Sequence, residues 1–188
     1  MNRKNRNRVF AAALVCALAA GAAGGCANPD KEGAQALEEG NYEEAVEQFQ
    51  QAAKSSDTGE AAEGYRGLGM AYYEMEDYEP ALEAFRQAAD GGAQQTIQTY
   101  NLMGICAMQT GDYGAALEYI QAGLALADSA TGDEVPHPDL VKEMKYNEII
   151  CYEEQADWEN AKAKASEYLS EYPDDEEVQR ESQFLETR

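Results

Sequence analysis

The sequence is short of the residues on which catalysis most often depends. Histidine occurs once among the 188 residues, as His137, and no pattern pairs it with a serine or cysteine nucleophile. His137 stands near Asp133, Glu134 and Asp139, but one histidine among carboxylates without helical spacing is a weak metal signal. We therefore predict no enzymatic activity, no cofactor and no metal site.

Positive charge is also scarce. The chain has 14 Lys and Arg residues against 36 Asp and Glu residues, and its formal net charge is −22. No acidic residue lies before residue 26, where four of the basic residues are found: Arg3, Lys4, Arg6 and Arg8. The acidic remainder repels nucleic acid and anionic lipid headgroups, so a nucleic-acid partner is not expected. The acidic surface either serves solubility alone or attracts a cationic partner, and the salt dependence of binding separates the two.

Long apolar runs are missing as well. The apolar stretch from Val9 to Ala23 follows a basic leader and is too short for a membrane span of about 20 residues. Small residues then precede Cys26. These features indicate a secretory signal peptide over residues 1–25.

This segment resembles the signal peptide of bacterial lipoproteins, although Ala23 stands where that family usually has leucine. The resemblance implies that residues 1–25 are removed and that Cys26 is lipidated and becomes the new N-terminus. It also implies an exported protein that is lipid-anchored at the bacterial cell membrane. The anchor lies at the outer face of the plasma membrane, or in the outer membrane if the source is diderm. Ordinary cleavage near Ala23 and an uncleaved anchor are the alternatives.

A two-helix unit extends from Tyr65 to Ala89. Four of its residues recur at i, i+3, i+4 and i+7 and form one stripe of a first helix: Tyr65, Leu68, Gly69 and Tyr72. A second stripe follows: Ala81, Leu82, Phe85, Ala88 and Ala89. Residues 76–78 between the stripes are turn-like. The pattern predicts two antiparallel helices, with Gly69 and Ala81 allowing their backbones to approach closely.

The unit recurs along the chain. Tyr100, Met103 and Gly104 follow Tyr65, Leu68 and Gly69 by 35 residues. Gly33 precedes Gly69 by 36 residues, and Trp158 follows Tyr113 by 45. The unit resembles the tetratricopeptide repeat (TPR), whose signature falls here on Tyr65, Leu68, Gly69, Tyr72, Ala81 and Phe85.

The resemblance implies an all-α fold, a right-handed α-solenoid of about four TPR helix pairs plus a C-terminal capping helix. The four TPR units occupy residues 26–175, at about 26–59, 62–95, 97–130 and 142–175. An inserted loop is expected over residues 128–139, because Gly132, Pro136 and Pro138 prevent a continuous helix. The loop either carries function or is a tolerated insertion. Residues 176–188 are expected to form the capping helix.

The fourth unit departs from the pattern at two positions. Ile149 stands where the earlier units have glycine, and Ala165 stands where they have Phe49, Phe85 and Ile120. A larger residue on one helix and a smaller one on its partner can compensate in volume. We expect a different helix crossing there.

Two cysteines occupy the same register position in units three and four. Ala71 stands there in unit two, so the position favours a small apolar residue, and Cys106 and Cys151 are interpreted as buried thiols. Neighbouring first helices pack about 8 to 10 Å apart, which is wide for a disulfide. A disulfide stays open as the alternative, because an exported compartment permits it.

Partner contacts are expected on first-helix residues that the repeat signature does not use. In this family the first helices line the concave surface, which implies a groove with these residues: Arg66, Met70, Tyr73, Asn101, Ile105, Met108, Tyr146, Asn147 and Ile150. Apolar groups with adaptable methionines suit an extended peptide or a helix. The alternative is that half of the groove residues pack between neighbouring helices.

These observations predict a membrane-anchored, non-catalytic TPR module that presents a concave groove to a protein or peptide partner. The alternative is a scaffold or regulator of cell-envelope assembly or secretion. A repeat fold hosts many functions, so the sequence does not name the process.

Overall fold

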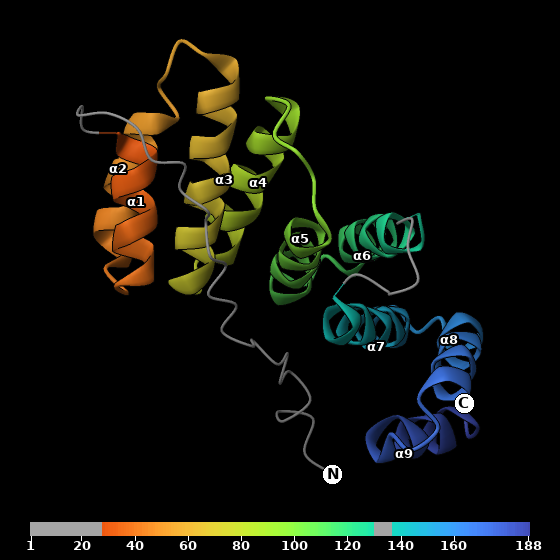
Figure 1. Ribbon diagram of the computed structural model, residues 1–188. Coiled ribbons are helices and arrows are strands. Elements are labelled where there is room, and N and C mark those ends of the chain that lie inside the picture. The colour runs from red at the N-terminus through yellow and green to blue at the C-terminus, as the bar shows by residue number, and fades with distance from the viewer. Residues whose placement is uncertain (1–27, 130–136) are drawn as a thin grey trace. The chain divides into compact units, whose positions relative to one another are not determined.

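The computed structural model describes residues 28–129 and 137–188, and within these ranges it contains nine helices and no strand (Figure 1). None of these helices is both long enough and apolar enough to cross a membrane. The predicted signal peptide with Cys26, and most of the predicted loop at residues 128–139, lie outside the described residues. The prediction of an all-α chain built from helix pairs is confirmed.

The chain divides into two compact units, and the first contains the described residues up to Gln95. It consists of two helix pairs: α1 (Pro29–Glu38) with α2 (Tyr42–Ala52), and α3 (Thr58–Glu74) with α4 (Tyr78–Asp90). Each helix packs against the next one along the chain, and α1 also contacts α3. We call α1, α3, α5 and α7 the first helices, and α2, α4, α6 and α8 the second helices.

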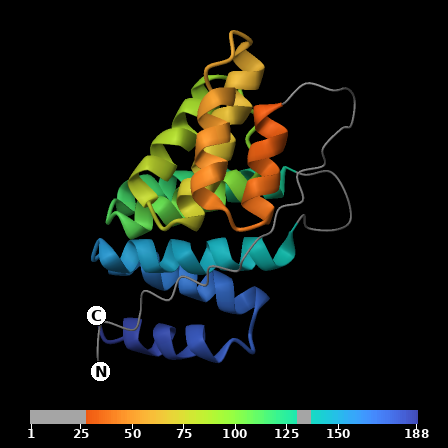
Figure 2. The same ribbon diagram turned by 90° about the vertical axis from the view of Figure 1, so that its left-hand side faces the viewer.

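The second unit begins at Thr96. It contains α5 (Ile97–Gln109), α6 (Tyr113–Asp128), α7 (Pro138–Glu154), α8 (Trp158–Glu171) and α9 (Glu176–Leu185). Each of these helices also packs against the next, so α7, α8 and α9 lie in sequence order (Figure 2). The first helices α5 and α7 are also in contact.

Short polar side chains begin most of these helices. The Asn28 side chain accepts a hydrogen bond from the Asp30 amide at 3.1 Å, and Pro29 occupies the first helical position, where its missing N–H has no partner to lose. Side-chain oxygens of five further N-cap residues accept amide hydrogen bonds in the same way: Asp57, Thr96, Asp112, Asp157 and Asp175. These caps favour the observed starts of the helices that have them.

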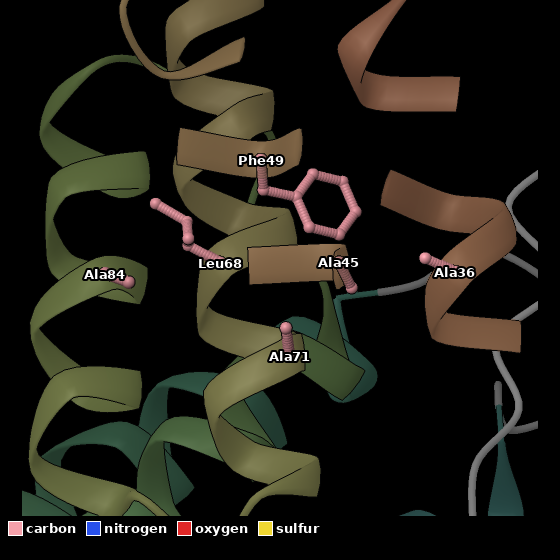
Figure 3. Close-up of a cluster of buried hydrophobic side chains, with 6 residues drawn as sticks. All are labelled: Ala36, Ala45, Phe49, Leu68, Ala71 and Ala84. Atoms are coloured by element: carbon pink, nitrogen blue, oxygen red, sulfur yellow. The ribbon is translucent and has the colours of Figure 1, made fainter. Parts of the chain in front are cut away.

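The core of the first unit is built around Phe49. Its ring is buried among small and aliphatic side chains from all four helices (Figure 3): Ala36, Ala45, Leu68, Ala71 and Ala84. The amphipathic stripes predicted from the sequence thus face inward. At Gly69 the sequence predicted close approach of the backbones opposite Ala81, but a Cβ there would lie 2.6 Å from the Phe85 ring. The close contact at Gly69 is therefore with the Phe85 ring.

The core of the second unit contains the two residues of the fourth helix pair that depart from the repeat pattern. Ile149 and Ala165 are both fully buried in one cluster with Ala161, Tyr168, Val178 and Leu185. Val178 and Leu185 belong to α9, so this helix closes the cluster with its apolar side. Burial of these groups away from water is the main favourable term that holds α9 in place.

Candidate binding surface on the first helices

In the first unit, the predicted groove residues lie along α3 and are half-buried. Arg66, Met70 and Tyr73 follow one another at helical spacing. The Arg66 Nε donates a hydrogen bond to the Glu63 carboxylate at 2.7 Å. The Tyr73 ring meets Tyr78 edge-on, with 6.0 Å between ring centroids. This face of α3 therefore offers partly exposed polar and aromatic groups.

Two carboxyl groups on the first helices of the first unit, those of Asp30 and Glu74, have raised pKa values. Burial raises the pKa of Asp30, and the nearby Glu60 and Glu63 raise it further, against an opposing effect of Arg66. Partial burial also raises the pKa of Glu74, whose side chain is nevertheless exposed, and a hydrogen bond with Tyr42 opposes the rise. Both groups are therefore less favourable in their charged form than an ordinary surface carboxylate.

In the second unit, four of the predicted groove residues are buried. Asn101 is 2% exposed, Ile105 3%, Met108 7% and Asn147 4%. These four leave little side-chain surface for a partner and agree with the alternative in which they pack between helices. Tyr146 and Ile150 are half-buried.

Tyr146 is already engaged by the C-terminal helix. Its hydroxyl donates a hydrogen bond to the Glu177 carboxylate of α9 at 3.2 Å, and its ring lies 6.4 Å from that of Tyr168. Burial and the nearby Glu177 raise the pKa of the Tyr146 hydroxyl. Tyr146 therefore helps to dock α9 in addition to lining this face.

Buried polar groups with unmet hydrogen bonds are found on the first helices. The Asn101 Oδ1 and the Asn147 Nδ2 are buried without a hydrogen-bond partner, as is the Asp30 Oδ1 in the first unit. Burial raises the pKa of Glu143 on α7, against a hydrogen bond from Asn101. Three carboxyl groups with raised pKa values lie on first helices: Asp30, Glu74 and Glu143.

A mixed-charge pocket in the second unit was not identified from the sequence. It has a volume of about 340 Å³ and lies between α6, α7 and α8, with Lys145 and Glu148 of α7 in its wall. Lys145 and Glu148 stand 45 residues after Tyr100 and Met103, so they occupy the positions in the fourth unit that these signature residues occupy in the third. A closer comparison of register positions would have found this signal.

Little in the described residues resembles a reactive centre. His137 is exposed at the start of α7, and its Nε2 lies 2.7 Å from the Gln98 side-chain nitrogen. In the ranges the structure describes, no group of three or more His, Cys, Asp or Glu side chains could hold a metal ion. Cys106 and Cys151 are free and fully buried, and burial raises the pKa of each thiol to about 12.

Three segments match models of the tetratricopeptide repeat, at residues 62–90, 97–129 and 146–175. They coincide with the second, third and fourth helix pairs. A search of curated proteins found no match. None of the matched families is an enzyme family.

Solved structures of other repeat proteins share the fold. YrrB, described as a TPR protein with an unusual peptide-binding site, is 16% identical with a TM-score of 0.68, over 84% of this chain and 74% of its own. MamA is 14% identical with a TM-score of 0.67, over 84% of this chain and 78% of its own. A TPR protein of Thermus thermophilus is 16% identical with a TM-score of 0.52, over 85% and 80%.

These identities are low, so the structural matches support the fold alone. The repeat spacing, the helix pairs and the family matches agree along most of the described chain. The chain is a tetratricopeptide-repeat protein, a member of a class that generally binds other proteins and does not catalyse reactions.

Proposed function

We propose that this chain is a non-catalytic adaptor that binds a basic protein or peptide through its first helices. We further propose that a lipid on Cys26 holds it at the bacterial cell membrane. The observation that carries the first part is that first helices in each of the two compact units have carboxyl groups with raised pKa values, Asp30 and Glu74 in the first unit and Glu143 in the second. Perturbed titrating groups gather at functional sites more often than elsewhere.

A cationic partner fits these groups for a physical reason. A carboxylate that burial destabilises gains more from a nearby positive charge than a fully solvated one does. The net charge of −22 would also accelerate the approach of a basic partner at low salt. Binding would stabilise the charged carboxylates and release protons, so affinity would rise with pH as these groups ionise.

The test compares two variants with the same change in net charge. The first replaces the perturbed carboxyls, as Asp30→Asn, Glu74→Gln and Glu143→Gln. The control replaces exposed glutamates of second helices, as Glu47→Gln, Glu83→Gln and Glu118→Gln. A partner cross-linked to the intact protein in membranes is purified, and its affinity for each variant is measured at several salt concentrations.

We expect the first variant to lose at least tenfold in affinity and the control to lose little. Equal losses would mean that only overall charge matters, and no loss in either variant would reject the first-helix surface.

The anchor is tested separately. If Cys26 is lipidated, mass spectrometry should find an acylated N-terminus at Cys26, and Cys26→Ser should abolish both the acylation and membrane retention. An unmodified wild-type N-terminus at another residue would reject the anchor and leave the binding proposal intact.

A further inference from the structure

The fourth helix pair has charged residues at two positions where earlier pairs have signature residues. Lys145 stands in register with Tyr65 and Tyr100, and Glu148 stands in register with Leu68 and Met103. Leu68 and Met103 are buried apolar residues, and Glu148 is equally buried, at 3% exposed. A carboxylate therefore occupies a core position of the repeat.

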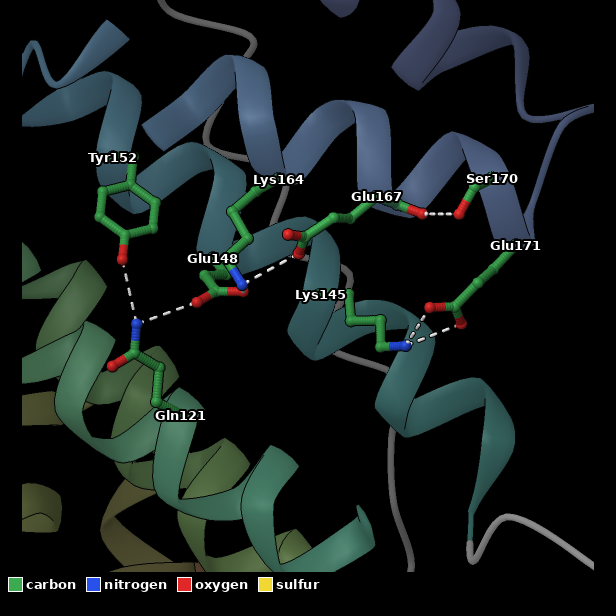
Figure 4. Close-up of polar contacts among 8 residues, drawn as sticks. All are labelled: Gln121, Lys145, Glu148, Tyr152, Lys164, Glu167, Ser170 and Glu171. Atoms are coloured by element: carbon green, nitrogen blue, oxygen red, sulfur yellow. Dashed lines mark hydrogen bonds and ion pairs between the residues drawn. The ribbon is translucent and has the colours of Figure 1, made fainter. Parts of the chain in front are cut away.

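Glu148 is held by side chains from both neighbouring second helices (Figure 4). Gln121 of α6 donates to its Oε1 at 2.9 Å, and the Lys164 ammonium of α8 lies 3.4 Å from its Oε2. Gln121 also donates to the Tyr152 hydroxyl at 3.1 Å. These contacts fix the orientation of the buried carboxylate.

Two further ion pairs also line the pocket. Lys145 contacts both carboxylate oxygens of Glu171 at 2.7 Å, and Lys164 lies 3.1 Å from Glu167 (Figure 4). All of these residues belong to α7 and α8, and they line the pocket of about 340 Å³.

The charges in this pocket do not balance. Four carboxylates line it, from Asp128, Glu148, Glu167 and Glu171, against the two ammonium groups of Lys145 and Lys164. Leu124, Ala125 and the Tyr168 ring supply apolar wall. The pocket therefore suits a cation that has an apolar stem.

We propose that this pocket receives an arginine side chain of a protein partner. The planar guanidinium offers five donors that match several carboxylates at once, and it is more weakly hydrated than an ammonium group. Its three-methylene stem would cover the apolar wall.

The charged residues Lys145 and Glu148 stand at repeat positions that hold uncharged residues in the second and third pairs, and this supports a binding role for the pocket. A buried ion cluster is weak evidence for stability, because desolvation of the charges offsets most of their attraction. A tyrosine and a leucine, as in the second helix pair, would serve packing at least as well. The pocket includes two residues of the first helix α7 but none of Asp30, Glu74 and Glu143, so the two proposals are tested by different variants.

The experiment fills the pocket without changing net charge. Lys145→Tyr with Glu148→Leu restores the residues of the second pair and removes one charge of each sign. Glu159→Gln with Lys162→Gln is the matched control, because both residues are exposed on α8 outside the pocket. The probe is the peptide acetyl-Ala-Arg-Ala-amide, titrated into the full isotope-labelled chain in detergent and followed by NMR.

For the wild type and the control, we expect saturable shifts of the Gln121, Glu148 and Lys164 signals. The filled variant should bind at least tenfold more weakly while keeping its helical circular dichroism. Glu148→Gln keeps the side-chain shape and should weaken binding severalfold. This variant tests the proposal even if the filled variant does not fold.

Three results would overturn the proposal. One is equal affinity of the wild type and the Glu148→Gln variant. Another is a set of shifts confined to residues outside α6, α7 and α8. The third is equal binding of acetyl-Ala-Lys-Ala-amide, which would reject arginine and indicate a general cation site.

Discussion

Residue Ala156 has a backbone conformation that alanine rarely adopts. Its φ is 57°, and the residues at the same place in the other three turns between first and second helices also have positive φ: Gly40, Glu76 and Gly111. In each turn two amides hydrogen-bond back to the first helix, as Ala156 and Asp157 do to the carbonyls of Glu153 and Tyr152. The turn geometry is thus conserved within the chain, whereas glycine is present in only two of the four turns.

We expect Ala156→Gly to stabilise the protein. The left-handed conformation costs a non-glycine residue about 1 to 2 kcal/mol, and the greater chain entropy of glycine when unfolded offsets part of this. The net gain should be about 0.5 to 1 kcal/mol, measured by chemical denaturation. The control Ala163→Gly, at an exposed position within α8, should lose about 1 kcal/mol instead. A loss at Ala156 as large as that at Ala163 would contradict the account.

At the scale of the element, each helix pair places a small residue on one helix against a larger residue on the other. A Cβ on Gly33 would lie 2.9 Å from the Phe49 ring, and one on Gly104 would lie 2.9 Å from Ile120. The fourth pair reverses the sizes, with Ile149 on the first helix and Ala165 on the second, and both are fully buried. The large side chain of this contact can therefore lie on the second helix, as in the first and third pairs, or on the first helix, as in the fourth.

A double-mutant cycle in the third pair tests this rule. Gly104→Ile alone overpacks the contact and should cost about 1 to 3 kcal/mol, and Ile120→Ala alone leaves a cavity and should cost about 2 to 5 kcal/mol. Together they reproduce the fourth pair, so the double variant should be more stable than the sum predicts by at least about 1 kcal/mol. The stabilities come from urea denaturation, and strict additivity would show that the two sites do not share a volume.

The sequence predicted the helix pairs well, because their stripes depend on local periodicity. It could not predict which first-helix residues stay exposed. Asn101, Ile105 and Met108 share their spacing with Arg66, Met70 and Tyr73, yet the first three are buried and the others are half-buried. Burial of this kind depends on neighbouring helices, which spacing within one helix does not report. The pocket at Glu148 was missed for a different reason, since only a register comparison reveals the change from apolar to charged.

At the scale of the whole molecule, acidic charge should make stability depend on pH. Unfolded carboxyls titrate near pH 4, and the folded forms of Asp30, Glu74 and Glu143 have raised pKa values. A raised carboxyl pKa contributes stability that is complete below about pH 4 and is lost as pH rises through the folded pKa. Repulsion within a chain of net charge −22 acts in the same direction.

We therefore expect the denaturation midpoint to fall as pH rises from about 4 to about 7. The fall should be smaller in the variant with Asp30→Asn, Glu74→Gln and Glu143→Gln. The variant with Glu47→Gln, Glu83→Gln and Glu118→Gln has the same net charge and should keep more of the slope. Identical slopes in the two variants would mean that overall charge, and not the raised pKa values of these three groups, controls the pH dependence.

The position of Trp158 has a consequence for spectroscopy. It is the only tryptophan in the chain, it packs against the core cluster of the fourth helix pair, and the Arg188 guanidinium carbon lies 5.6 Å from its ring centroid. Selectively excited fluorescence therefore reports on the C-terminal part alone, whereas far-ultraviolet circular dichroism averages over all the helices. Repeat arrays can melt in stages. Separate transitions in the two signals would show that the two units unfold independently, and coincident ones that they unfold as a single cooperative block.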